Sequence, residues 1–194
     1  FWMMNVFGAA AGLMVIGSAA SMAKASLGTS SFIAVVVLSV GNAGGRILAG
    51  VISDKIGRQW TLFVAFMIQG MVVLIPIYFA NNAVILLVAL MTIGACYGAN
   101  LTLFPSATKD QFGMKSFGLN YGVMFTAWGV GGLILPRIAG MVKDLTGKED
   151  IAFYIASGLM VCGALLAIIN QGRTTRAQQA LVERQSVADH LAGT

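Results

Sequence analysis

The chain has 194 residues, of which 58% are hydrophobic and only 10% are charged, and its formal net charge is +5. Soluble domains carry roughly 25% charged residues, so this composition, with a mean hydropathy of +0.84, excludes a large soluble domain and is typical of a multi-pass membrane protein. In such a protein an excess of basic residues sets the topology and does not indicate nucleic-acid binding.

Six apolar segments are long enough to cross a membrane, since about 20 helical residues span ~30 Å of hydrocarbon. The runs are continuously apolar and lack the alternation of a transmembrane β-barrel. In chain order they cover residues 2–23, 30–52, 60–80, 83–107, 117–142 and 151–170. We therefore predict an all-α transmembrane fold, a six-helix bundle over residues 1–170. Residues 171–194 form a polar tail that is either a short surface helix or disordered.

The second segment contains an arginine, Arg46, about six residues before its expected end. A charged side chain at the centre of a bilayer costs at least ~2.5 kcal/mol, and such residues commonly line ion or substrate pathways. Ser39, Asn42 and Arg46 share one stripe of the helix. This stripe favours a face that lines a watery cavity, where Arg46 binds an anion. The alternative is a structural arginine whose long side chain reaches the membrane surface.

A charged turn follows, from Gly50 to Gln59, with the sequence GVISDKIGRQ. Gly57 can adopt a positive φ where the chain reverses, and Gly50 permits a close approach between helices. Asp54 and Arg58 are four residues apart and can form an ion pair. On charge alone, an ordinary basic cytoplasmic loop is the favoured interpretation of this turn.

The fourth and fifth segments carry further candidate binding residues. Tyr97 and Asn100 are three residues apart on one helix face, where they either donate hydrogen bonds to a substrate or bond to a neighbouring helix. Tyr121, Phe125 and Trp128 form an aromatic stripe with helical spacing. This stripe is either ordinary helix packing or, through Trp128, one wall of a binding cavity.

Glycine is frequent, with 24 residues, and clusters in the second and fifth segments. Such clusters either make helices deformable, as transport requires, or allow helices to pack closely. The two clusters are Gly41, Gly44 and Gly45, and Gly129, Gly131 and Gly132.

The distribution of basic residues predicts the orientation in the membrane, because Lys and Arg are enriched in cytoplasmic loops. We expect residues 53–59, residues 108–116 and the tail to lie on one side. That side carries seven basic residues, Lys55, Arg58, Lys109, Lys115, Arg173, Arg176 and Arg184, against Lys24, Lys143 and Lys148 on the other. The richer side is predicted to be cytoplasmic, in a cell (inner) membrane.

The spacing G-x-x-x-D-K-x-G-R at residues 50–58 resembles the signature loop of the major facilitator superfamily. Its members have twelve helices in two six-helix halves, with this loop after the second helix of a half. The resemblance implies that this chain is the C-terminal half, helices 7–12, and that an N-terminal six-helix half is its partner. The chain begins at Phe1 without an initiator Met, so we expect a fragment or the second half of a longer protein. The resemblance also assigns a gating motif: Gly50, Asp54, Lys55, Gly57 and Arg58.

A narrower resemblance concerns residues 105–132, which include NYGVMFTAWGVGG, and residues 41–58. They are similar to helices 11 and 8 of the oxalate/formate antiporter family, to which monocarboxylate transporters are related. In that family an arginine on helix 8 binds the substrate carboxylate, and Arg46 occupies that position. The oxalate member also has a lysine on helix 11, where this chain has Trp128. A single cation suits a monocarboxylate better than a dicarboxylate.

We therefore expect secondary active transport of a small organic anion by alternating access, as a monocarboxylate carrier for formate or lactate, with oxalate less favoured. The expected substrate-binding residues are Arg46, Tyr97, Asn100 and Trp128. No acidic residue lies deep in a segment, so a coupling group lies in the other half, or the anion carries the proton, or anions are exchanged.

Two alternatives remain at this stage. One is a proton-coupled carrier of a sugar, nitrate or a drug, and the other is a membrane anchor or receptor domain that transports nothing. No catalytic motif, metal site or cofactor motif is present, so an enzyme is not expected. The two cysteines, Cys96 and Cys162, form neither a metal-binding spacing nor a disulfide framework.

Overall fold

The computed structural model describes residues 1–79, 81–147 and 150–192, with side chains for these ranges except residue 25 and residues 173–192. All regular structure in the described part of the chain is helical. Its elements are α1 (Trp2–Leu27), the 3₁₀ turn η1 (Gly28–Ser30), α2 (Phe32–Ile56), α3 (Arg58–Val72), α4 (Ile75–Phe79), α5 (Ala83–Phe112), α6 (Phe117–Thr146) and α7 (Asp150–Ala192).

Six stretches are long and apolar enough to cross a membrane, as predicted. They are Trp2–Lys24, Gly28–Ile56, Arg58–Phe79, Ala83–Phe112, Phe117–Thr146 and Asp150–Gly172. Most extend a few residues beyond the predicted limits, because the charged residues next to the apolar runs continue the same helices. The predicted turn at residues 53–59 shrinks to a single non-helical residue, Gly57.

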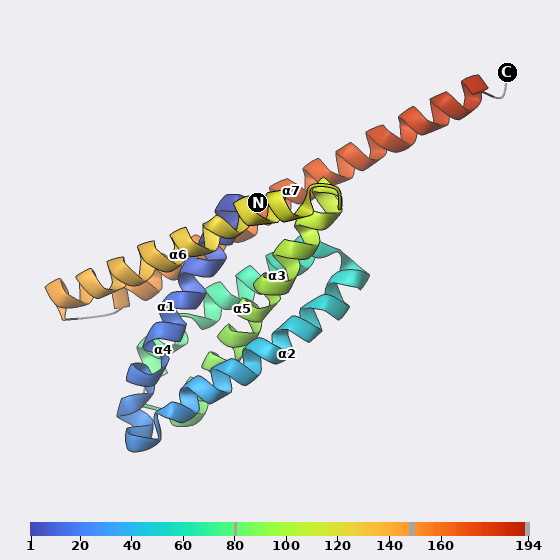
Figure 1. Ribbon diagram of the computed structural model, residues 1–194. Helices are drawn as coiled ribbons and strands as arrows, with labels where there is room; N and C mark the ends of the chain where they lie inside the picture. The colour runs from blue at the N-terminus through green and yellow to red at the C-terminus, as the bar shows by residue number, and fades with distance from the viewer. Residues whose placement is uncertain (80, 148–149, 193–194) are drawn as a thin grey trace.

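Two helices differ more clearly from the prediction. The third segment is two helices, because Pro76 has no N–H to bond to Val72 and its ring crowds that carbonyl; α3 accordingly ends at Val72. The last helix continues through the predicted tail to Ala192 and extends away from the bundle (Figure 1). Lys148 and the side chains of Arg173, Arg176 and Arg184, used to predict the orientation, lie outside the described residues.

The first three spans and the last three pack against each other in matched pairs (Figure 1). α1 lies mainly against α6, α2 against α5, and α3 against α7. Within an 18-residue apolar stretch of each span, the buried share is 56, 28 and 39% in the first three spans and 56, 22 and 39% in the last three. This repeated order indicates two similar three-helix units, an arrangement common in transporters. α1 and α5 form the centre, and α2 and α6 are the most exposed spans.

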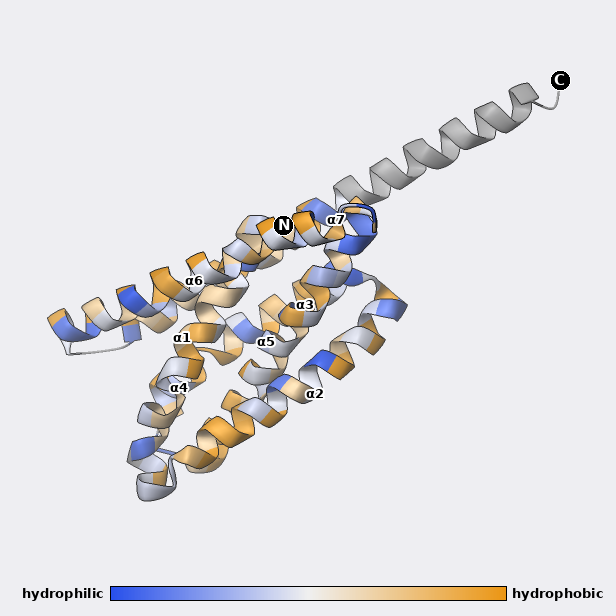
Figure 2. Cartoon of the chain, in the orientation of Figure 1, coloured by the Kyte–Doolittle hydropathy of each residue, from blue (hydrophilic) through white to orange (hydrophobic). Residues whose placement is uncertain are grey.

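Hydrophobic residues recur along the helices of the bundle (Figure 2), and many of the large ones are exposed on its outer faces. Ile47 of α2 is 71% exposed and Leu133 of α6 is 73% exposed, whereas Phe66 and Leu90 are fully buried. Large apolar patches in contact with water are rare in soluble proteins. These outer faces therefore meet lipid or other transmembrane helices.

Candidate functional site

Arg46 lies on an exposed face of α2, ten residues before the end of the helix at Ile56. At 1.5 Å per residue this places it ~15 Å from that end, deeper than the sequence predicted. Its Nε donates a hydrogen bond of 3.0 Å to Oδ1 of Asn42, one turn earlier. No partner for the two terminal nitrogens is found among the described residues. The hydrogen bond at Nε therefore orients the guanidinium. Its two terminal nitrogens are left to bind an anion in a bidentate manner.

The backbone under Arg46 is fixed by very close packing between α2 and α5. A Cβ on Gly45 would overlap the backbone of Ala95, and a Cβ on Gly98 would overlap the carbonyl of Asn42. The predicted glycine cluster on α2 thus serves packing at two of its three positions, since Gly44 faces open space. Four glycines make this contact: Gly41, Gly45, Gly94 and Gly98.

Tyr97 of α5 contacts two further helices, α1 and α6. It is buried, with 5% of its surface exposed, and its ring fills the space above Gly12 of α1. Nε1 of Trp128, on α6, donates a hydrogen bond of 2.7 Å to its hydroxyl. Arg46 lies within electrostatic range of Tyr97. Tyr97 and Trp128 therefore meet between α5 and α6, and the charge of Arg46 on α2 acts on Tyr97 without a hydrogen bond between these two described residues.

Trp128 is also the last ring of a continuous series on α6, which we call the aromatic row: Phe117, Tyr121, Phe125 and Trp128. Successive ring centroids are 5.6, 5.6 and 5.5 Å apart, and the Phe125 and Trp128 rings are nearly parallel at 9°. The sequence predicted this stripe, and the structure adds Phe117 and the bond to Tyr97. The row leads from the start of α6 to the Arg46 site.

Asn100, the fourth predicted site residue, is not part of this group. It is 3% exposed, and its Nδ2 would lie 2.9 Å from a Cβ on Gly8 of α1. Neither Nδ2 nor Oδ1 has a hydrogen-bond partner in the described part of the chain. Gln69 of α3 is likewise fully buried with both side-chain polar atoms unpaired. The sequence did not point to Gln69, because a lone glutamine in an apolar run has no distinctive spacing.

The predicted gating motif forms a charged network at the opposite end of α2 from η1, which we call the motif end. Gly57 has a φ of +91°, as predicted. Arg58 pairs with Asp54 at 2.8 Å, also as predicted, and with Asp110 of α5 at 3.2 Å. It also donates to the hydroxyl of Ser53. No sequence signal indicated the pair with Asp110, which lies 52 residues away.

The remaining two motif residues behave differently. A Cβ on Gly50 would meet nothing within 4 Å, so the predicted close helix approach there is wrong: the contact with α5 is made by Gly41 and Gly45. Lys55 is exposed. The charged network borders a cavity of about 330 Å³ that Gln59 and Gln111 also line.

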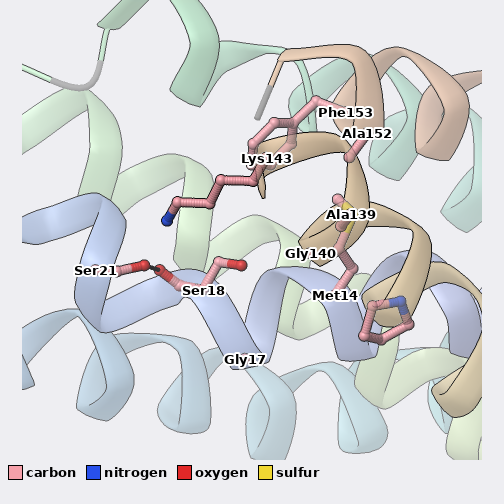
Figure 3. Close-up of a pocket in the computed structure, with 10 residues that line it drawn as sticks. Met14, Gly17, Ser18, Ser21, Ala139, Gly140, Lys143, Ala152 and Phe153 are labelled. Carbon is pink, nitrogen blue, oxygen red and sulfur yellow. Dashed lines mark hydrogen bonds between the residues drawn. The ribbon is translucent and has the colours of Figure 1, made fainter. Parts of the chain in front are cut away.

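A second cavity of about 330 Å³ lies between α1, α6 and α7. Figure 3 shows Lys143 of α6 extending over Ser18 and Ser21 of α1, with Phe153 of α7 nearby. Ser21 donates a hydrogen bond of 2.8 Å to the carbonyl of Ser18. This cavity lies toward the η1 end of the bundle and is lined by none of the predicted site residues.

Comparison with known proteins gives one family match, to the Major Facilitator Superfamily, over residues 2–190. The chain is 31% identical over 139 residues to the uncharacterized MFS-type transporter YhjX of Escherichia coli K12, covering 69% of this chain and 35% of that protein. It is 26% identical over 136 residues to human monocarboxylate transporter 14, covering 69% and 26%. Mouse monocarboxylate transporter 9 is 28% identical over 134 residues, with the same coverage. The chain thus spans about a third or less of the length of these relatives.

Proposed function

The chain belongs to the major facilitator superfamily, and we propose that it works as the C-terminal six-helix half of a carrier for small organic anions. The proposed substrate is a monocarboxylate such as formate or lactate, moved by alternating access against an N-terminal half. Two of the similar proteins are named monocarboxylate transporters. These names support the substrate class, and identities of 26% and 28% do not select one acid.

The observation that carries this proposal is the position of Arg46. It is an exposed cation deep in an apolar helix, and its one described hydrogen bond is to a neutral amide. An uncompensated charge at this depth is costly unless water or an anion meets it. A guanidinium presents paired N–H donors whose spacing matches the two acceptor oxygens of a carboxylate. We assign Arg46 to bind the carboxylate and Tyr97 and Trp128 to shape the site around it.

The neighbours of Arg46 support a substrate with one negative charge. Trp128 stands where the similar oxalate carriers have a lysine, and its indole nitrogen bonds to Tyr97. Apart from Arg46, no described residue of this cluster is a cation. A dicarboxylate would leave its second charge unpaired at membrane depth, which is unfavourable. Oxalate is therefore the less favoured substrate.

The gating role of the motif is a further part of the proposal. Arg58 ties the ends of α2, α3 and α5 together through Asp54 and Asp110. These ion pairs are partly exposed, with 27% of the Arg58 side chain accessible, so they are weak enough to break and re-form. We assign Gly50, Asp54, Lys55, Gly57 and Arg58 to the gate that closes the motif end.

The same proposal fixes the orientation and the division of the chain. The motif end faces the cytoplasm of a cell (inner) membrane, with residues 1–170 as the transmembrane half and 171–194 as the cytoplasmic tail. The excess of basic residues at residues 53–59 and 108–116 supports this orientation. Antiport of two anions and symport with a proton are both compatible with the site.

The test is uptake of labelled lactate and formate by the full-length carrier in liposomes. Arg46→Ala is expected to abolish uptake and Arg46→Lys to reduce it strongly, because lysine cannot bind a carboxylate bidentately. Arg137→Ala, on an exposed part of α6, is the matched control and is expected to retain uptake. Unchanged uptake in Arg46→Ala would refute the assignment. Competition by nitrate instead of by carboxylates would favour the nitrate alternative.

A further inference from the structure

The aromatic row has a feature that helix packing does not explain. α6 already packs on α1 through a separate stripe, which includes Ala127 and Gly131. The row lies beside that stripe and leaves 41% of Phe125 uncovered. Its last ring is not free to turn toward lipid, because Trp128 is hydrogen-bonded to Tyr97 of α5. The row therefore continues the Arg46 site along α6.

Charge and geometry at this junction select one kind of occupant. The cationic guanidinium of Arg46 lies within electrostatic range of Tyr97, which in turn is bonded to Trp128. Directly next to Trp128, Phe125 forms a nearly parallel pair with it at a centroid distance of 5.5 Å. A molecule with a carboxylate at one end and an aromatic ring at the other fits a cation followed by two aromatic rings. Its carboxylate pairs with the guanidinium, and its ring gains attraction from offset stacking beyond the effect of burial.

We infer that Phe125 and Trp128 bind the aromatic ring of a substrate whose carboxylate is held by Arg46. The carrier then prefers aryl-substituted monocarboxylates to acids of the size of formate or lactate. This inference rests on the proposed function for the role of Arg46, and it adds the substrate class. The ring lies on the motif-end side of the carboxylate, because the row runs from Trp128 back toward Phe117 at the start of α6.

The test compares two acids of equal charge and similar size, phenylacetate and cyclohexylacetate, as competitors of labelled lactate uptake by the full-length carrier in liposomes. Burial alone predicts equal potency. Aromatic pairing predicts that phenylacetate inhibits at an about fivefold lower concentration. Phe125→Leu is expected to bring this potency ratio close to one. Phe125→Tyr keeps the ring and is expected to keep the ratio, as is Phe32→Leu, a control at an exposed phenylalanine of α2.

A binding measurement separates failure of this inference from failure of the proposed function. Isothermal titration of the purified carrier with each acid gives affinities that do not depend on transport. Phenylacetate binding that is lost in Phe125→Leu and kept in Phe125→Tyr supports the inference even where no lactate is transported. Equal affinities for the two acids, or equal affinities of Phe125→Leu and the unaltered carrier for phenylacetate, overturn it. In that case the row only packs against lipid or against the other half.

Discussion

Asn42 and Arg46 are joined by a hydrogen bond of 3.0 Å between Oδ1 and Nε, one turn apart on α2. The backbone of Asn42 is itself packed closely against Gly98 of α5, so the residue that carries the acceptor is held at its backbone. Because the acceptor is a neutral amide, it orients the guanidinium without cancelling its charge. The pair therefore holds a cation ready for an anion inside an apolar segment.

Replacing Asn42 tests this orientation. Asn42→Ala is expected to raise the KM for lactate about tenfold or more with little change in maximal rate, since a hydrogen bond to a charged group contributes roughly 1.5–3 kcal/mol. Asn42→Asp is expected to weaken binding further, because its carboxylate pairs with Arg46 and competes with the substrate. Concentration-dependent uptake measures both effects. An unchanged KM in both variants would show that Asn42 does not position Arg46.

Gly44 and Gly45 are adjacent on α2, but only Gly45 packs against α5, so we expect only its substitution to destabilise the protein. Gly45→Ala puts a methyl group into the backbone of Ala95, and overpacking of this kind costs roughly 1–3 kcal/mol. We expect a melting temperature lower by about 2–4 °C for each kcal/mol, together with reduced transport. Gly44→Ala faces open space and serves as the control. Equal melting temperatures for the two variants would contradict the observed packing.

Substitution of Asn100 distinguishes a substrate-binding role of this residue from a structural one. Its amide is buried without a partner among the described residues, and such a group costs roughly 1–3 kcal/mol. Asn100→Leu, of similar size, is therefore expected to raise the melting temperature. A rise with unchanged uptake removes Asn100 from the substrate site, and a rise with lost uptake returns it there. A lower melting temperature would mean that water or another segment satisfies this amide.

Removing an ion pair from Arg58 is expected to change the uptake rate and to leave the stability of the protein nearly unchanged. Asp110→Asn removes one of its two ion pairs, and exposed pairs are worth only about 0.2–1 kcal/mol each. We expect nearly unchanged melting and a maximal uptake rate reduced several-fold, because the gate at the motif end closes less often. Lys109→Gln is the control, because Lys109 is exposed next to Asp110 on α5, lies outside the motif and forms no ion pair between described residues. An equal loss of uptake rate in both variants would show that the Arg58–Asp110 ion pair is not its specific cause.

Substitution of Trp128 tests the link between charge and substrate. Trp128→Lys places a second cation near Arg46 and is expected to make oxalate an effective competitor of lactate uptake. Trp128→Phe removes the hydrogen bond to Tyr97 without adding charge, and it is the matched control. Oxalate competition in the unaltered carrier would show that one cation suffices for a dicarboxylate.

Much of the fold could be predicted because membrane helices are encoded locally. Length and continuous hydropathy identify six spans, and the spacing from Gly50 to Arg58 identifies the superfamily. Local pairs were also predictable, since Asp54 and Arg58 are only four residues apart, on either side of Gly57. The positive φ of Gly57 and the stripe that ends at Arg46 were predictable for the same reason. These features depend on residues within one or two helical turns of each other.

The tertiary structure alone decided which of these residues meet. Tyr97 and Asn100 share a helix face in the sequence, yet Tyr97 reaches Trp128 on α6 and Asn100 is buried against α1. The glycines of α2 were ambiguous until α5 was seen to contact Gly45 and not Gly44. Contacts between distant segments depend on how the helices cross, and crossing is set by packing over whole helix faces. Local spacing therefore determined the helices and their stripes, and packing determined the site.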